Sequence, residues 1–352
     1  MPRWKSEVRS DRGVFSELAE WWDAQPVPRE HPFLTSRVLG CWEDGFDEPG
    51  SRLNVLLLHR DGELVAGLPL YLARGRLRSL ARTYAEPFDV ISIDDEEVTE
   101  YVPKWLESVP LASLYRVRST SPILRFLPQH PRWRVQTEFN SPYIDLSAGM
   151  RPVRDRMSSK YQRELRRRRR RIEEIGTLTF VERSTSEGAM DLLQEGLRLE
   201  STGWKGRRGH AVIKDPSHER WYRSLTEVAL DQGWLRLSGL YLDERLVAFL
   251  YNLEVDGHRY GMATAFDDTP EVAPFSPGIL LHESVFEACA AVGVTSYRLG
   301  VGNDSWKYEW ATDRDQVYDL VLFGTGLMGW SAFQVWKVRT RARDRSIDRN
   351  HT

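Results

Sequence analysis

Residues 237–252 read LSGLYLDERLVAFLYN, two apolar runs separated by a short polar turn that contains Asp243. Short apolar runs on either side of a tight polar turn are typical of a β-hairpin. Residues 55–70 read VLLLHRDGELVAGLPL and predict a second hairpin, with its turn at Asp61-Gly62. Each half of the 352-residue chain therefore contains one predicted hairpin.

The two hairpins superpose when the first is moved by 182 positions along the sequence. The positions matched by this shift are Leu58 with Leu240, Asp61 with Asp243, Leu64-Val65-Ala66 with Leu246-Val247-Ala248, and Tyr115-Arg116 with Tyr297-Arg298. Two separate segments in one register favour a duplicated domain over a chance resemblance. A chain of this length also suggests about two domains.

The C-terminal half predicts a regular succession of elements. We expect a strand over 177–183, helices over 186–199 and 217–231, strands over 235–242, 245–255 and 258–267, a helix over 277–292, a strand over 296–301, a short helix from 306, and a strand over 316–323. The helix over 277–292 is expected to have Ser276 as its N-cap, Pro277 as its first residue and Gly293 after its end. This order predicts a mixed α/β sheet covered by helices.

This element order resembles the GNAT acyltransferase superfamily, in particular its two-copy branch. That branch includes the Fem-type peptidyl transferases and the acetyltransferases associated with cellulose synthesis. The residues that carry the resemblance are the basic helix Lys160–Arg171, Glu200-Ser201-Thr202-Gly203-Trp204-Lys205-Gly206, Ser276-Pro277-Gly278, Gly300-Val301-Gly302 and Trp306-Lys307-Tyr308. Two tandem GNAT-like mixed-sheet domains are implied, a degenerate copy over 1–150 and an acyltransferase domain over 151–352. Within the second we expect a basic helix over 155–175, a core over 177–325 and a C-terminal helix over 327–345.

Ser276-Pro277-Gly278 opens a helix, where free backbone N–H groups and the positive end of the helix dipole attract an anion. The resemblance implies that the acyl-CoA pyrophosphate lies here, against Ser276, Pro277, Gly278 and Ile279. Backbone N–H groups near Thr264 and Ala265 are expected to contact the thioester oxygen. Two observations leave the donor open: the usual Gln/Arg-x-x-Gly-x-Gly/Ala loop is absent, and Ser276 can itself cap the helix amides.

Two side chains are candidates for proton transfer. Glu200 follows Leu193 and Leu197 on the apolar face of its helix, and a carboxylate turned inward suits a general base for an amine. The alternative is that Glu200 bonds to Lys205 or to the glycine-rich backbone that follows. For Tyr308, the resemblance implies protonation of the departing thiolate, and plain packing is the alternative.

Five further residues are candidates for substrate contact. They are Trp204, Lys205, Asp267, Lys307 and Arg168. Trp204 and Lys205 lie in a glycine-rich stretch that can shape an acceptor pocket, although Trp204 can equally close the edge of the core. Lys307 can neutralise a phosphate or a carboxylate.

Residues 160–171 contain eight basic side chains and one acidic one. A continuous helix over 155–175 places Met157, Tyr161, Leu165, Ile172 and Ile175 on one buried stripe, with Arg168 facing the protein. The outward arginines would then be Arg166, Arg167, Arg169, Arg170 and Arg171. Such a cluster in the Arg163–Arg171 helix predicts a polyanionic partner, either tRNA, an anionic membrane surface or an anionic acceptor.

Composition excludes several other classes of protein. Only Cys41 and Cys289 are present and the eight histidines are scattered, so we expect no metal site and no disulfide framework. The longest apolar stretch, 317–336, contains Asp319 and three glycines and is not typical of a membrane span. A reducing, cytoplasmic setting is expected, with peripheral membrane contact as a variant.

These observations favour an N-acyltransferase that moves an acyl group, acetyl in the first instance, from acyl-CoA directly to an amine. The acceptor would be a small molecule, a sugar or a peptide. One alternative is a Fem-type transferase that uses aminoacyl-tRNA as donor. Another is a non-catalytic scaffold or membrane-surface protein, suggested by the basic and aromatic C-terminal segment. Neither the acceptor nor the number of subunits follows from these residues.

Overall fold

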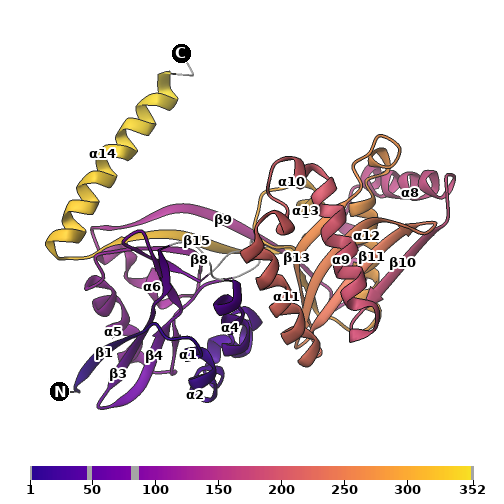
Figure 1. Ribbon diagram of the computed structural model, residues 1–352. Coiled ribbons are helices and arrows are strands. Elements are labelled where there is room, and N and C mark those ends of the chain that lie inside the picture. Colours follow the sequence, from indigo (N-terminus) through magenta and orange to yellow (C-terminus); the bar gives the residue numbers. More distant parts are fainter. Residues whose placement is uncertain (1, 46–49, 81–86, 350–352) are drawn as a thin grey trace.

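The computed structural model describes residues 2–45, 50–80 and 87–349, and shows two α/β halves joined through a shared sheet (Figure 1). The N-terminal half contains β1 (Trp4–Arg9), α1 (Val14–Glu17), α2 (Ala19–Asp23), α3 (Pro26–Glu30), α4 (Ser36–Gly45), β2 (Ser51–Leu53), β3 (Val55–Arg60), β4 (Glu63–Leu68), β5 (Leu70–Ala73), β6 (Arg76–Ser79), β7 (Ile91–Ser92), α5 (Glu96–Glu107), β8 (Leu111–Arg118), α6 (Pro122–Phe126) and β9 (Trp133–Asp145). Short 3₁₀ turns lie at Pro32–Leu34 and Leu127–Gln129.

The C-terminal half follows the predicted order. It contains α7 (Met150–Arg156), α8 (Ser159–Glu173), β10 (Leu178–Arg183), α9 (Ser186–Thr202), α10 (Trp204–Arg207), α11 (Pro216–Asp231), β11 (Leu235–Leu242), β12 (Arg245–Val255), β13 (His258–Phe266), α12 (Pro277–Ala291), β14 (Ser296–Arg298), α13 (Ser305–Trp310), β15 (Asp313–Phe323) and α14 (Leu327–Arg349), with 3₁₀ turns at Val212–Lys214 and Ala273–Phe275. The mixed α/β fold class is confirmed.

Both predicted hairpins are confirmed, as β3–β4 and β11–β12. Their turn residues Asp61 and Asp243 share a φ of 54°. A β-bulge follows Leu58 in the first hairpin and Leu240 in the second, positions 182 residues apart. Because a bulge changes strand twist at one specific place, its recurrence in register supports the internal repeat.

Strands from both halves build one eleven-stranded sheet, in the order β10-β11-β12-β13-β14-β9-β15-β8-β6-β5-β2. β9 from the N-terminal half lies between β14 and β15, and β15 pairs on its other side with β8. The remaining strands form a four-stranded sheet, β1-β3-β4-β7. The division of domains at residue 150 stays a prediction, since strands from both sides of it share one sheet.

Two large apolar clusters cover the C-terminal part of the shared sheet. One joins α9 and α11 to α1, α2 and α4 of the N-terminal half, with Trp22 and Trp221 fully buried. The other joins α7, α8 and α12, and contains Leu165 and Phe286. The helices on one face therefore also hold the two halves together.

The predicted continuous helix over 155–175 is wrong. Met157 adopts an extended conformation (ψ 142°), and the Ser158 hydroxyl caps a new helix, α8, by accepting from the backbone N–H of Tyr161 (3.1 Å). A serine N-cap is a strong local start signal and divides the pattern into α7 and α8. Ile175, expected on the buried stripe, is 52% exposed.

One arginine of α8 also points differently from the prediction. Arg169 turns inward and donates to Glu283 Oε2 (3.0 Å) and to the Ser284 hydroxyl (3.3 Å) on α12. Arg168 is half-buried, and its guanidinium group pairs with Glu164 one turn earlier (2.9 Å). The α8 arginines therefore divide into a set that packs on the protein and a set that faces outward.

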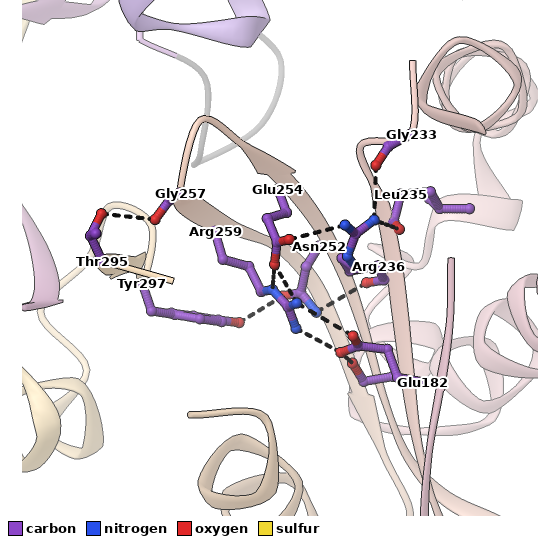
Figure 2. A network of polar contacts seen from close by, with 11 residues as sticks. Glu182, Gly233, Leu235, Arg236, Asn252, Glu254, Gly257, Arg259, Thr295 and Tyr297 are labelled. Carbon is purple, nitrogen blue, oxygen red and sulfur yellow. Dashed lines mark hydrogen bonds and ion pairs between the residues drawn. The ribbon is translucent and has the colours of Figure 1, made fainter. Parts of the chain in front are cut away.

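A buried arginine ties together the end of the sheet at which β13 and β14 pair. Arg259 on β13 is 1% exposed and donates to Glu182 Oε2 on β10 (2.6 Å) and to Glu254 Oε2 on β12 (2.8 Å) (Figure 2). Arg236 donates to the other oxygen of Glu254 (3.0 Å), and the Tyr297 hydroxyl on β14 donates to Asn252 (2.7 Å). This network, the Arg259 cluster, connects strands β10 to β14.

α14 extends away from the rest of the protein (Figure 1). Phe333 and Trp336 attach its first turns to Phe323 of β15. Among the helices within the described residues, none has the length and apolar character needed to span a bilayer.

Candidate functional site

β13 pairs with β14 only over its first three residues, because β14 ends at Arg298. His258, Arg259 and Tyr260 pair in parallel with 296–298, and no pairing follows Tyr260. Beyond this point a Cβ on Gly261 would lie 2.9 Å from the Tyr297 hydroxyl, and Gly300 turns the chain away with a φ of 71°. The separation opens a cavity of about 840 Å³, the donor cavity.

Several residues predicted for the site line the donor cavity. They are Trp204, Lys205, Thr264, Ser276, Gly278, Ile279 and Lys307. They come from α10, β13, α12 and α13, which are far apart in the sequence. The fold therefore brings together the start of α12 and the open edge of β13.

Other predicted residues do not line this cavity. Ala265 is 5% exposed and packs in the apolar cluster beneath α9. Asp267 accepts from the backbone N–H of Thr269 (2.9 Å) and pairs with Arg245 (3.2 Å), so it shapes the loop after β13. Pro277 is buried in the first turn of α12, and Arg168 is held on α8.

Ser276 differs from the expected N-cap. It lies in the left-handed region (φ 52°, ψ 61°), and its side chain makes no capping hydrogen bond. The hydroxyl therefore caps no amide, but the backbone N–H groups of Ile279 and Leu280 donate to the Ser276 carbonyl (2.9 and 3.2 Å). Since Pro277 has no N–H, Gly278 carries the remaining amide of the first turn. A Cβ on Gly278 would lie 3.2 Å from Phe266 Cδ1, so glycine leaves room beside the helix start. The end of α12 agrees with the prediction, because Gly293 follows it with a φ of 83°.

Glu200 is paired with Lys205, the alternative considered for it. Lys205 Nζ donates to Glu200 Oε1 (2.7 Å) and to the Thr264 carbonyl on β13 (2.8 Å). Glu200 Oε2 accepts from the backbone N–H of Val212 (2.8 Å), and the residue is 6% exposed. Glu200 thus places the Lys205 ammonium group at the open edge of β13.

Lys307 holds the loop after β14. It is 7% exposed, and its Nζ donates to the carbonyls of Gly300 (3.3 Å) and Val301 (3.1 Å) and lies 3.4 Å from Asp304 Oδ2. Burial lowers the pKa of Lys307, with the nearby Asp304 carboxylate opposing this change. The adjacent Tyr308 is 37% exposed, and its hydroxyl donates to Asn303 Oδ1 (3.1 Å). Asn303 lines the donor cavity, so the hydroxyl of Tyr308 lies one residue behind the wall.

His282 lines the donor cavity and was missed from the sequence. Its ring is 6% exposed and stacks near Trp306, with ring centroids 4.5 Å apart. The Nδ1 atom has no hydrogen-bond partner among the described residues. Burial, followed by the charge of Lys307, lowers the pKa of His282 to about 3. Helix periodicity could have indicated it, since His282 lies one turn after Gly278 on the same side of α12.

We expect His282 to make the stability of the protein depend on acidity. Its folded-state pKa of about 3 lies below the unfolded value of 6.5, so stability is full above pH 6.5 and is lost as the pH falls towards 3. At pH 5 the loss is about 2 kcal/mol. In His282→Phe the difference in unfolding free energy between pH 8 and pH 5 should shrink by that amount, measured by urea denaturation. Equal pH dependence in both proteins would contradict this assignment.

The described residues contain no group of three or more His, Cys, Asp or Glu side chains that could hold a metal ion. The donor cavity instead presents backbone groups, an ammonium group and a helix N-terminus. Such groups can bind an anionic donor and stabilise negative charge on a carbonyl oxygen.

Residues 159–308 match the family model described as Acetyltransferase (GNAT) domain, a range that begins at α8 and ends in α13. None of the curated proteins matches the chain in sequence.

Several solved structures share the fold over nearly the whole chain. FemX has a TM-score of 0.57 at 12% identity, covering 94% of this chain and 99% of its own. L-PGS from Bacillus licheniformis has a TM-score of 0.52 at 15% identity, covering 94% and 97%. A tandem GNAT protein from the clavulanic acid biosynthesis pathway has a TM-score of 0.50 at 12% identity, covering 92% and 100%. At these identities the similarity shows the fold alone, which the chain shares with this tandem GNAT protein.

Proposed function

We propose that the part of the chain matched by the GNAT acetyltransferase model, residues 159–308, transfers an acyl group from acyl-CoA to an amine. The observation that carries the proposal is the opening between β13 and β14, with the start of α12 at its wall. An extended thioester can lie along the open edge of β13 while its pyrophosphate meets the Gly278 amide and the positive end of the α12 dipole. The reducing, cytoplasmic setting expected from the sequence is part of the same proposal.

In the proposed reaction, the amine nitrogen attacks the thioester carbonyl carbon. The new C–N bond forms, the C–S bond breaks, and CoA leaves as a thiolate that takes up a proton. The backbone N–H of Thr264 and the Lys205 ammonium group would stabilise the negative charge on the carbonyl oxygen. Lys205 is suited to this because Glu200 and the Thr264 carbonyl hold it in place.

Glu200 and Tyr308 remain the candidates for proton transfer. Lys205 separates Glu200 from the donor cavity. It would pass one of its protons to Glu200 as it takes up the proton of the attacking amine. Tyr308 would give its hydroxyl proton to the departing thiolate after turning from Asn303 Oδ1, to which it donates, towards the leaving sulfur. Trp204 is 39% exposed with the Arg208 guanidinium group 5.4 Å from its ring, and would form one side of the acceptor entrance.

The outward face of α8 favours a second candidate, an aminoacyl-tRNA donor. Arg163, Arg166, Arg167 and Arg170 are exposed at spacings of three or four residues, so they lie along one side of the helix. Arg171 differs from them, because its guanidinium group lies 5.7 Å from the ring of Phe275, which precedes Ser276. The two sets allow the donors to be separated by mutation.

The test replaces Arg163, Arg166, Arg167 and Arg170 together by Gln and leaves Arg168, Arg169 and Arg171 intact. We expect the parent and this variant to bind acetyl-CoA with the same affinity by calorimetry, and to acetylate a small amine at the same rate. The matched control Arg171→Gln removes one charge beside the start of α12 and should weaken acetyl-CoA binding several-fold.

The opposite result would select the tRNA donor. In that case the parent would not bind acetyl-CoA but would bind tRNA, and the salt dependence of tRNA binding would become weaker in the quadruple variant. Each lost phosphate contact should reduce that slope by about 0.7 to 0.9.

A further inference from the structure

A second cavity, of about 480 Å³, lies where the two halves meet; we call it the inter-half cavity. Its wall contains residues from the end of α3, the end of β8, the turn between β12 and β13, β14 and the start of β15. The basic residues in this wall are Arg29, His31, Arg116, Arg118, His258 and Arg298. Both halves therefore contribute positive groups to one cavity, whose wall also contains Glu30, Asp256 and Asp315.

The internal repeat delivers two equivalent arginines to this cavity. Arg116 at the end of β8 and Arg298 at the end of β14 are 182 positions apart, the same shift that relates the hairpins. Arg116 has a φ of 61°, an unfavourable conformation for a residue with a side chain. Asp319 accounts for this conformation, because the backbone N–H and the guanidinium group of Arg116 both donate to its Oδ1 (2.9 and 2.6 Å). The arginine of β8 that has an exposed partner at this cavity is therefore Arg118.

The guanidinium groups of Arg118 and Arg298 are both partly buried and each pairs with one exposed acid, while Arg118 also lies 3.5 Å from the buried carboxylate of Asp89, which stays in place. Arg118 is 17% exposed and pairs with Glu30 (3.0 Å), whose side chain is 60% exposed. Arg298 is 28% exposed and pairs with Asp315, whose side chain is 52% exposed. An exposed ion pair contributes little, about 0 to 1 kcal/mol. An anion inside the cavity can therefore replace Glu30 and Asp315 at low cost.

His31 supports the same conclusion. Its Nδ1 atom is buried and has no hydrogen-bond partner within the part of the chain described. Burial, followed by the charges of Arg118, Arg298 and His258, lowers the pKa of His31 to about 3. A buried polar atom without a partner is costly, and an oxyanion held by Arg118 and Arg298 would supply one.

The inter-half cavity adjoins the donor cavity, because Gly300 and Val301 line both. A molecule anchored in the inter-half cavity therefore reaches the loop that Lys307 holds against the donor cavity. The two cavities therefore border the same short loop.

We propose that the inter-half cavity binds the anionic group of the amine acceptor, a carboxylate or a phosphate, through Arg118 and Arg298, displacing Glu30 and Asp315. The role of this anion as part of an acceptor rests on the proposed acyltransferase function. Anion binding itself does not depend on it.

The kinetic test compares matched amines with acetyl-CoA as donor: ethanolamine, β-alanine and phosphoethanolamine. We expect the parent to favour the anionic amines, and the stronger of the two identifies the anion as carboxylate or phosphate. Arg298→Gln should raise KM for that amine about 10- to 100-fold, since hydrogen bonds to charged groups are strong. The KM for acetyl-CoA should not change. The control Arg37→Gln removes an exposed arginine that pairs with Asp231 and should have no effect.

A gain of binding excludes misfolding as the explanation. Asp315→Asn removes the carboxylate that competes for Arg298, so it should tighten pyrophosphate binding several-fold in calorimetry.

The Gly278→Glu background blocks the α12 site and isolates the inter-half cavity. Pyrophosphate binding that persists there and disappears with Arg298→Gln supports the anion site, even if no amine is acetylated and the acyltransferase proposal fails. Acetylation with no preference for anionic amines, unchanged in Arg298→Gln, would overturn the anion site while leaving the acyltransferase proposal standing.

Discussion

The Gly278→Glu variant is expected to bind no acetyl-CoA and to transfer no acyl group, while its fold stays intact. Gly278 is the second residue of α12 and lines the donor cavity. A glutamate there places bulk and negative charge where the proposed pyrophosphate meets the helix. A carboxylate in the first turn interacts favourably with the positive end of the helix dipole, so α12 itself is not destabilised. Calorimetry with acetyl-CoA and a thermal unfolding curve measure the two effects separately.

Gly278→Gln and Gly278→Ala are the matched controls. Glutamine has the size of glutamate without its charge, so it should weaken binding less than glutamate does. Alanine adds only a Cβ, 3.2 Å from Phe266 Cδ1, and the Phe266 ring can move by the few tenths of an ångström required. Acetyl-CoA affinity unchanged in Gly278→Glu would remove the start of α12 from the donor site.

Arg259→Met is expected to destabilise the protein by about 3 to 5 kcal/mol, since it breaks a buried ion-pair network by removing its central cation. Met keeps most of the apolar volume, but Glu182 and Glu254 lose the guanidinium group between them (Figure 2). The resulting repulsion acts at the paired end of β13 and β14. The free energy of unfolding from urea denaturation measures the change.

Arg236→Met is the control within the same network. Arg236 is more exposed than Arg259, with 22% of its side chain accessible, and its loss leaves Glu254 paired with Arg259. We expect a cost of about 1 kcal/mol for this variant. Equal losses in the two variants would mean that Arg259 has no special role in holding the sheet together.

The elements predicted correctly are those whose signals are local. The β3–β4 and β11–β12 hairpins follow from alternating apolar runs and a polar turn, and α12 follows from Pro277 at its start and Gly293 after its end. The division of α7 from α8 was also a local signal, the Ser158 cap, but the arginine periodicity on both sides of it concealed the break. The error arose because the spacing of the buried stripe was given more weight than the serine cap.

The site was predicted in part. The start of α12 and Thr264 were expected at the donor, and Lys205 and Lys307 at the substrate, and all of them line one cavity. The role of Glu200 depended on distances that helix periodicity does not contain, because Lys205 and the backbone of Val212 occupy its two oxygens. His282 was missed because its position on α12 does not reveal that β13 and β14 separate beside it.

The sequence by itself determined the repeated hairpin, the order of helices and strands in the C-terminal half, and the two ends of α12. These depend on side-chain alternation, turn chemistry and helix ends, which act over a few residues. Only the tertiary structure decided that β9 enters between β14 and β15 and that Arg118 and Arg298 meet in one cavity. The physical reason is that these contacts join residues more than 150 positions apart, and they form where burial of both halves against a shared sheet brings distant segments together.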